Sequence, residues 1–236
     1  MHSNASNLQV LFEDNHLIVV NKRAGDIVQG DKTGDKSLAE HVKTYIKDNY
    51  NKPGNVYLGI VHRLDRPTSG IVIYARTSKA AARMSELFRD KNIEKTYWAV
   101  VEKAPEQPSG KLTHWLKKNP KQNKSYAVTK EQPEYKKAVL SYQTLAQGDR
   151  YALVSVRIET GRHHQIRCQL STIGSIIKGD LKYGAKRSNR DGSISLHARS
   201  VTFAHPVTKE EITITAPVPE DNLWQSLATI ADEKVQ

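Results

Sequence analysis

The chain has 236 residues, with 36 Lys and Arg against 25 Asp and Glu, so its formal net charge is +11 and its pI is near 9.6. This length fits one large domain, and 38% hydrophobic residues are typical of a globular protein. A single cysteine, Cys168, excludes an intramolecular disulfide and favours a cytoplasmic location. The sequence lacks a signal peptide and any apolar run of about 20 residues, so we expect no membrane span. The basic surplus points to a polyanionic partner.

Hydrophobic periodicity predicts several strands with interspersed helices in the first hundred residues. A loop is expected over 25–34, and Ser37 is a plausible N-cap for the helix that follows. In chain order we expect two strands within 8–22 around a turn at 13–16, a helix over 36–50, strands over 56–64 and 70–75, a helix over 78–89 and a strand over 95–102.

Residues 111–137 hold eight Lys and only two acids, Glu131 and Glu134. This stretch is either a flexible solvated excursion or a contact for backbone phosphates. Beyond it, Asp221 or Asn222 is expected to cap the closing helix. The remaining predicted elements are strands over 138–146 and 151–159, a helix over 162–172, strands over 195–204 and 211–216, and a helix over 222–230.

These elements predict an α+β fold with a mixed, mostly antiparallel central sheet flanked by helices and loops. Strands dominate, and the helices do not alternate strictly with them. No internal repeat or clear boundary divides the chain. We therefore expect a single domain over 1–236, with its core over about 8–232.

Residues 59–70 carry an unusual concentration of charge between two β-prone runs. On a strand with a two-residue period, Val61, Arg63 and Asp65 would share one face. A carboxylate at the end of a strand is held on a rigid scaffold yet can face a cleft. The alternative is that Asp65 caps the turn that follows it, and spacing alone favours that interpretation.

The segment His62-Arg63-Leu64-Asp65-Arg66-Pro67-Thr68-Ser69-Gly70 resembles the HRLDxxTSG motif of the RluA family of pseudouridine synthases. Further segments match that family in the same order along the chain. Residues 95–101 look like its strand with an active-site tyrosine, and residues 161–170 are similar to its GRxHQIRxHL motif. Its opening, the segment after the third motif and its C-terminal strand pair are matched by 13–22, 177–184, 196–199 and 203–206, so the resemblance covers roughly 10–216.

Two positions depart from the family pattern. The opening reads Lys22-Arg23-Ala24-Gly25 where Lys-Pro-x-Gly is usual, and Gln169 stands where His is common. Too few residues precede the core for the S4 RNA-binding domain that many relatives carry, so we expect none. That expectation concerns the selection of substrate, and not catalysis.

The resemblance implies that Asp65 is the catalytic carboxylate in the isomerisation of uridine to pseudouridine. The bond from C1′ to N1 breaks, the uracil turns, and C1′ joins C5. A carboxylate beside C1′ can stabilise or bond to the electron-poor carbon, as in retaining glycosidases. Alternatively, it removes a proton from C2′. Both routes need an ionised Asp65, and neither needs a metal or a cofactor.

The resemblance assigns two more catalytic residues. Arg167 is expected to pair with Asp65 and keep it ionised, and helical spacing would put it on one stripe with His163, Ile166 and Leu170. Tyr97 is expected to stack on the uracil and to assist removal of the C5 proton. The competing interpretations are an arginine that reaches solvent at the helix edge and a tyrosine of the core.

The remaining expected contacts are with RNA, either rRNA or tRNA, and not with DNA or a membrane. A uridine in structured RNA must leave its stack before C1′ can be reached, and Arg63 could fill the vacated space or hold a phosphate. We expect a monomer without a cofactor. The residues assigned to substrate or RNA binding are His62, Arg63, Leu64, Arg66, Arg162, His163 and Leu170.

Two other chemistries fit the sequence less well. A hydrolase could use Ser69 and His163 with Asp65, but the G-x-S-x-G elbow is missing. A zinc site is suggested by His164 and Cys168, four residues apart, yet no further ligand pattern accompanies them, so no metal is expected.

A glycosidase and a silent RNA-binding protein would each share some of these sequence features. A glycosidase would need a second carboxylate, such as Glu159 or Asp180, and a basic chain with 7% aromatic residues does not suit a sugar cleft. A catalytically silent RNA-binding or ribosome-assembly protein that retains the fold would have the same charge. Intact Asp65, Tyr97 and Arg167 favour the enzyme, since a pure binder has no reason to keep a carboxylate where phosphates approach.

Overall fold

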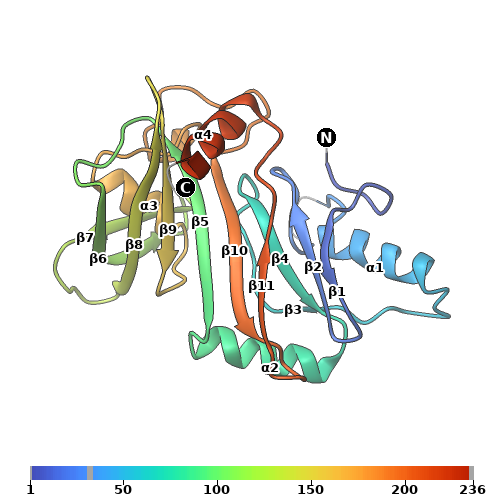
Figure 1. The fold of residues 1–236 in the computed structure, drawn as a ribbon. Helices are drawn as coiled ribbons and strands as arrows, with labels where there is room; N and C mark the ends of the chain where they lie inside the picture. The colour runs from blue at the N-terminus through green and yellow to red at the C-terminus, as the bar shows by residue number, and fades with distance from the viewer. Residues whose placement is uncertain (1, 31–33, 234–236) are drawn as a thin grey trace. The chain divides into compact units, whose positions relative to one another are not determined.

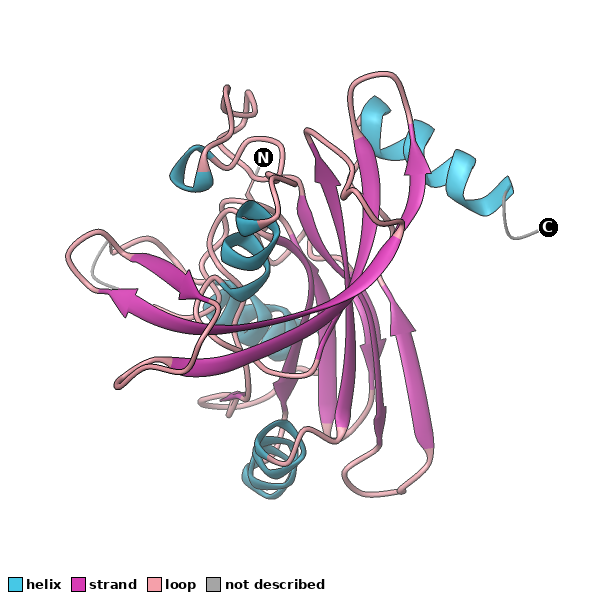
Figure 2. Cartoon of the chain, turned by 90° about the vertical axis from the view of Figure 1, so that its left-hand side faces the viewer, coloured by secondary structure: helices cyan, strands magenta, loops and turns pink. Residues whose placement is uncertain are grey.

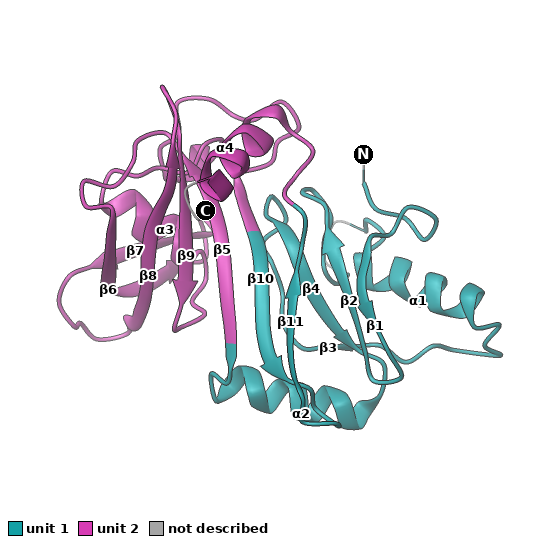
Figure 3. Ribbon diagram, in the orientation of Figure 1, with its two compact units in different colours: residues 1–93, 198–217 teal, residues 94–197, 218–236 magenta. Residues whose placement is uncertain are grey.

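The computed structural model describes residues 2–30 and 34–233, and it groups the chain into two compact units. Unit 1 comprises Met1–Ile93 and Ala198–Pro217, and unit 2 comprises Glu94–His197 and Val218–Gln236 (Figure 3). Within the loop predicted over 25–34, residues 31–33 lie outside the described part. A single catalytic domain over 1–236 stays a prediction.

In unit 1 the strand pairs β1–β2, β2–β4, β3–β4 and β10–β11 are antiparallel (Figure 1). Strand β2 pairs with β4 from Leu17↔Ala75 to Lys22↔Gly70, so the end of β2 lies opposite the first residues of β4. The strand order is β1-β2-β4-β10, while β11 pairs with β10 and β3 with β4. Their bounds are β1 Val10–Glu13, β2 Leu17–Lys22, β3 Gly59–Ile60, β4 Ser69–Ala75, β10 Leu196–Ala204, which belongs to this unit from Ala198, and β11 Glu211–Thr215.

Two helices complete unit 1, α1 (Leu38–Asn49) and α2 (Ser78–Arg89). The N-cap of α1 is Ser37, whose side chain accepts a hydrogen bond from the amide of Glu40 while the Glu40 carboxylate accepts one from the Ser37 amide. This reciprocal pair satisfies two amides that the first helical turn leaves without partners. The predicted helix and its cap are confirmed. The apolar side of α1 is buried with Val20, Val72 and Tyr74 of the sheet.

Unit 2 contains the other strands of the strand order, β5-β9-β8-β6-β7, which pair antiparallel with one another (Figure 2 draws every strand of the chain in magenta). Helix α3 buries Ile166 and Leu170 against Val154 and Val156 of β9. The Asp221 carboxylate accepts hydrogen bonds from the first amides of α4, which identifies the cap. The elements are β5 Ile93–Val101, β6 Ser109–Asn119, β7 Lys124–Val128, β8 Lys136–Gln147, β9 Ala152–Ile158, α3 Gln165–Thr172, η1 Leu181–Tyr183 and α4 Asn222–Glu233.

The α+β class with a mostly antiparallel sheet is confirmed. The Lys-rich stretch, however, is ordered: β6 and β7 form a hairpin with a ladder from Trp115↔Val128 to Asn119↔Lys124. The hairpin buries Leu116 and Ser125, and Leu116 packs in a small core with Ala138, Cys168 and Tyr183. Because Leu116 is the one apolar side chain that β6 and β7 bury, the apolar alternation typical of a strand is weak, which explains why the run of lysines concealed the hairpin in the sequence.

Two element boundaries were predicted wrongly. The strand expected over 56–64 contracts to Gly59–Ile60, so residues 61–65 do not alternate as on a strand. The helix expected from 162 begins at Gln165, because His164 has a left-handed backbone with φ of 52° that no right-handed helix can contain. No helix within 2–30 and 34–233 is long and apolar enough to cross a membrane.

Candidate active site

Asp65 lies in the connection between β3 and β4 of unit 1. The amide of Thr68 donates a hydrogen bond to the Asp65 carbonyl at 3.0 Å, which closes a turn over residues 65–68. Asp65 is partly buried, whereas Arg63 is exposed. The predicted sharing of one strand face by Val61, Arg63 and Asp65 is therefore wrong, and a turn presents Asp65 instead.

A buried lysine holds this turn from inside the unit. Lys22, the last residue of β2, is only 1% exposed. Its Nζ donates to three carbonyl oxygens: that of Arg66 at 3.0 Å, that of Thr68 at 2.7 Å and that of Arg23 at 3.0 Å. An ammonium group has three N–H donors, so these three acceptors use all of them. Lys22 thus ties the peptide groups on the C-terminal side of Asp65 to the end of β2.

The charge of Lys22 also acts on the site. Burial lowers the pKa of Lys22 to about 8, while the carboxylates of Asp26 and Asp65 act in the opposite direction. Asp65 therefore has a cationic group within electrostatic reach inside its own unit. The sequence assigned no role to Lys22, although it closes the apolar run of β2, which is the signal that could have identified it as buried.

The turn is held from outside the unit's core as well. The amide of Gly25 donates to the Arg66 carbonyl at 2.8 Å, and Arg66 Nε donates back to the Gly25 carbonyl at 3.0 Å. A second nitrogen of Arg66 pairs with Asp35 at 2.8 Å, and both side chains are about half exposed. The chain thus achieves a close contact between its opening turn and the Asp65 turn without the usual proline. A phosphate contact by Arg66 stays a prediction.

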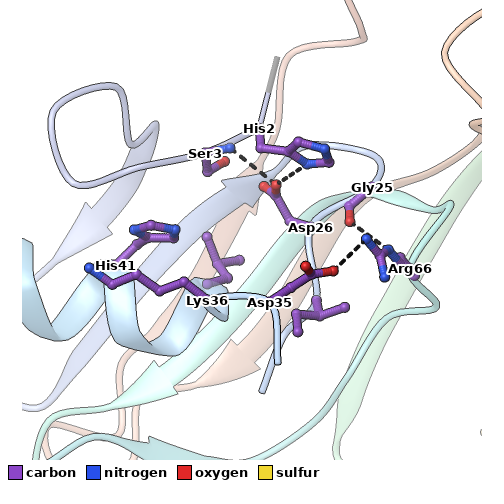
Figure 4. A pocket seen from close by; sticks show the side chains of 10 residues that line it. His2, Ser3, Gly25, Asp26, Asp35, Lys36, His41 and Arg66 are labelled. Atoms are coloured by element: carbon purple, nitrogen blue, oxygen red, sulfur yellow. Dashed lines mark hydrogen bonds and ion pairs between the residues drawn. The ribbon is translucent and has the colours of Figure 1, made fainter. Parts of the chain in front are cut away.

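A pocket of about 230 Å³ adjoins Arg66 in unit 1 (Figure 4). Asp26 lies in its wall, where its Oδ1 accepts from the Ser3 amide at 3.1 Å and lies 3.2 Å from His2 Nδ1. This volume is below the 300–1,000 Å³ usual for ligand sites. The carboxylate is engaged by the unit's own residues, so the pocket gives no independent indication of a ligand.

His62 and Leu64 make contacts inside unit 1. His62 Nε2 accepts a hydrogen bond from the Ile73 amide at 2.9 Å, and its ring stacks on Phe88 with centroids 4.7 Å apart. Leu64 packs against the core under α1. These contacts fix the path of the chain on both sides of Arg63, and the predicted RNA contacts of His62 and Leu64 stay predictions.

Gly70 follows the turn and permits a close approach of two strands. Its φ is +110°, and a Cβ at this position would collide with the backbone of Ala198. Only glycine has both the conformation and the space for this contact. The TSG end of the motif is therefore a structural requirement for placing β4 beside β10.

In unit 2, Arg167 is buried on α3 with 5% of its surface exposed. Its Nε and Nη2 donate to the two carboxylate oxygens of Asp180, at 2.6 and 2.8 Å. Its guanidinium carbon also lies 5.2 Å from the ring centroid of Tyr183. Ile166, Arg167 and Leu170 are all buried on α3, but His163 precedes the helix, so it is not on the predicted stripe.

Tyr97 lies on β5, opposite Val156 of β9, and is partly buried against the core of unit 2. His163 faces the β6–β7 hairpin, with Nδ1 2.9 Å from Ser125 Oγ and Nε2 3.2 Å from Asn123 Oδ1. Arg162 is exposed and donates to the Lys137 carbonyl. The roles expected of these residues stay predictions, as does that of Leu170, which is fully buried in the core.

The predicted residues divide between the two units. Asp65 and its neighbours belong to unit 1, and Tyr97, Arg162, His163, Arg167 and Leu170 belong to unit 2. The pairing of Asp65 with Arg167 and the approach of Tyr97 stay predictions.

The two residues of the zinc alternative, His164 and Cys168, both lie in unit 2. No group of three or more metal-binding His, Cys, Asp or Glu side chains occurs within 2–30 and 34–233. His164 Nδ1 lies 3.1 Å from the Tyr183 hydroxyl, and burial raises the pKa of Cys168 to about 11.

The sequence matches a known protein family over most of its length. The model of the RNA pseudouridylate synthase family matches residues 16–172. The tRNA pseudouridine synthase C of Haemophilus influenzae is 32% identical over 238 residues, covering 93% of this chain and 96% of that protein. The ribosomal large subunit pseudouridine synthase D of Zymomonas mobilis is 31% identical over 224 residues, covering 91% of this chain and 70% of that protein.

Solved structures show the same fold. The human RNA pseudouridylate synthase domain containing 4 has a TM-score of 0.76 and 24% identity, covering 95% of this chain and 93% of that one. The domain containing 1 protein has a TM-score of 0.73 and 21% identity. With the family match, these findings confirm the resemblance drawn from the HRLDxxTSG segment. The chain belongs to the RNA pseudouridylate synthase family, of the RluA type, whose members are isomerases that act on uridine in RNA.

Proposed function

We propose that this enzyme converts specific uridines of structured rRNA or tRNA to pseudouridine and that Asp65 is its catalytic carboxylate. The observation that supports this role is the buried Lys22, whose three hydrogen bonds fix the turn that presents Asp65. A turn that served only to connect two strands would not need a buried ammonium beneath it. The names of the relatives, which specify ribosomal and transfer RNA, support the substrate class.

The reaction requires an ionised carboxylate next to C1′. As the C1′–N1 bond breaks, Asp65 either bonds to C1′ or removes a proton from C2′, and then C1′ joins C5 of the turned base. The hydrogen on C5 leaves to solvent and N1 gains a proton, so the composition of the RNA does not change. Asp65 and Lys22 lie within electrostatic reach of each other, since the Asp65 charge raises the pKa of Lys22 against the effect of burial.

Residues of unit 2 would complete the chemistry. Arg167 would support the ionised Asp65. Tyr97, which is partly buried on β5, would stack on the uracil and assist the loss of the C5 proton. Neither step uses a metal or a cofactor. Arg63 and Arg66, both exposed, would contact the RNA backbone near the extruded uridine.

Release of tritium from RNA labelled at C5 of uridine tests this function. Wild-type enzyme should release tritium, and Asp65→Asn should release none while it binds the same RNA with similar affinity. Equal release by Asp65→Asn and wild type would refute the role of Asp65. Binding without release from any rRNA or tRNA by the wild type would favour the alternative, a silent RNA-binding or ribosome-assembly protein.

A further inference from the structure

The ion pair between Arg167 and Asp180 joins two almost fully buried side chains, 6% and 1% exposed. A buried ion pair is not an efficient source of stability, because removing two charges from water offsets much of their attraction. The distinctive effect of this ion pair is to fix the orientation of the two side chains. Asp180 does not belong to the motif that carries Arg167, and the pair joins α3 to the segment that precedes η1.

The hydrogen bonds to Asp180 fix the orientation of the Arg167 guanidinium plane. The two hydrogen bonds run from Nε and Nη2 to separate oxygens of one carboxylate, which is the side-on bidentate arrangement. The guanidinium carbon also lies over the ring of Tyr183, 5.2 Å from the ring centroid. The edge that carries Nη1 is consequently turned away from Asp180, and Arg167 cannot rotate about its terminal bonds without breaking both hydrogen bonds.

Asp180 is itself rigidly placed. Its amide donates to the Ile177 carbonyl, and its carbonyl accepts from the amides of Tyr183 and Ala185, each at 3.0 Å. The hydroxyl of Tyr183 accepts from the Ser125 amide at 2.8 Å, which anchors this ring to β7. Asp180 and Tyr183 together therefore form a support for Arg167 that is locked to the sheet of unit 2.

We propose that Asp180 is a positioning residue for the pseudouridine synthase reaction and acts through Arg167. Asp180 would keep the Nη1 edge of the guanidinium in one fixed orientation, and this orientation would allow Arg167 to act on the catalytic carboxylate. This inference rests on the proposed role of Arg167. Asp180 is 1% exposed, so its proposed role is to position Arg167 and not to contact the RNA.

The isosteric variant Asp180→Asn tests this role, because an amide can accept only one of the two hydrogen bonds. Supporting residues of this kind usually change activity by about 10–100-fold, so kcat should fall by that factor while KM for RNA is unchanged. Asp191→Asn, an exposed carboxylate in the same unit that accepts from Ser193, is the matched control and should retain kcat.

A double-mutant cycle on kcat distinguishes the two proposals. If Asp180 acts only through Arg167, Asp180→Asn should cause no further loss when added to Arg167→Leu. Normal turnover by Arg167→Leu would refute the proposed role of Arg167. A strongly lowered but measurable kcat for Arg167→Leu together with wild-type kcat for Asp180→Asn would overturn the role of Asp180 alone.

Loss of folding could also lower activity, so a second variant is needed. Asp180→Glu keeps the charge but moves the carboxylate by one methylene. It should fold, as shown by circular dichroism, and give a kcat between those of the wild type and Asp180→Asn with unchanged KM. A positioning role would be contradicted by a folded Asp180→Glu variant with wild-type kcat. It would also be contradicted if Asp180→Asn lost RNA affinity to the same extent as kcat.

Discussion

Replacing Lys22 by Met tests the turn that presents Asp65. Methionine matches the length of the lysine stem and suits a position that is 1% exposed, but it donates no hydrogen bond. The carbonyls of Arg23, Arg66 and Thr68 would each lose a donor. The variant therefore separates the hydrogen bonds of Lys22 from the volume of its side chain.

The size of the effect follows from what each carbonyl retains. The Arg66 carbonyl keeps the Gly25 amide at 2.8 Å, and that of Arg23 keeps a longer bond from Asp26 at 3.3 Å. The Thr68 carbonyl loses its 2.7 Å bond to the ammonium. Hydrogen bonds to charged groups contribute about 1.5–3 kcal/mol each, and removal of a buried charge offsets part of the loss. We expect unfolding free energy to fall by about 2–4 kcal/mol.

Two measurements check this prediction. For a chain of this size that loss corresponds to a decrease in Tm of about 5–15 °C by circular dichroism. Displacement of Asp65 by about 1 Å would lower kcat in the tritium assay about 100-fold even at temperatures where the variant is folded. Lys79→Met, an exposed lysine of α2, is the control. A Lys22→Met protein with the Tm and kcat of the wild type would refute the reasoning.

Three further outcomes are expected. Burial lowers the pKa of Lys22 from 10.5 to about 8, so between these pH values the unfolded chain binds more protons than the folded protein. The unfolding free energy of the wild type, relative to that of Lys22→Met, should therefore rise with pH across this window, and a fall would show that folding raises the pKa. Gly70→Ala should lower the unfolding free energy by about 2 kcal/mol or more, because the new Cβ would collide with the Ala198 backbone. The control Gly174→Ala also has a positive φ but no atom within 4 Å of the new Cβ, so it should lower the unfolding free energy by only about 1 kcal/mol; equal decreases in Tm would contradict the collision. The pKa of Cys168, raised to about 11 by burial, predicts very slow reaction with a thiol reagent at pH 8 until the protein is denatured, and fast labelling of native protein would disprove it.

Local patterns in the sequence were sufficient for most elements. Helix α2 follows from its apolar spacing, and helix α1 follows from apolar spacing together with its Ser37 cap. Both signals lie within one or two helical turns of the sequence. The HRLDxxTSG segment identified the family and singled out Asp65, because several motifs occur in the same order along the chain. Neither conclusion needed contacts between distant residues.

Only the tertiary structure decided what surrounds the chemical groups. Lys22 and the turn it binds are more than 40 residues apart, and no periodicity connects them. The left-handed His164 that delays α3 has no local signal, since its ring is held by Tyr183 from a later segment. Asp180 was visible in the sequence, but its buried pairing with Arg167 was not. The sequence by itself determined the family, most elements and the candidate carboxylate, whereas the buried hydrogen bonds that orient such groups depend on long-range packing and were decided by the fold.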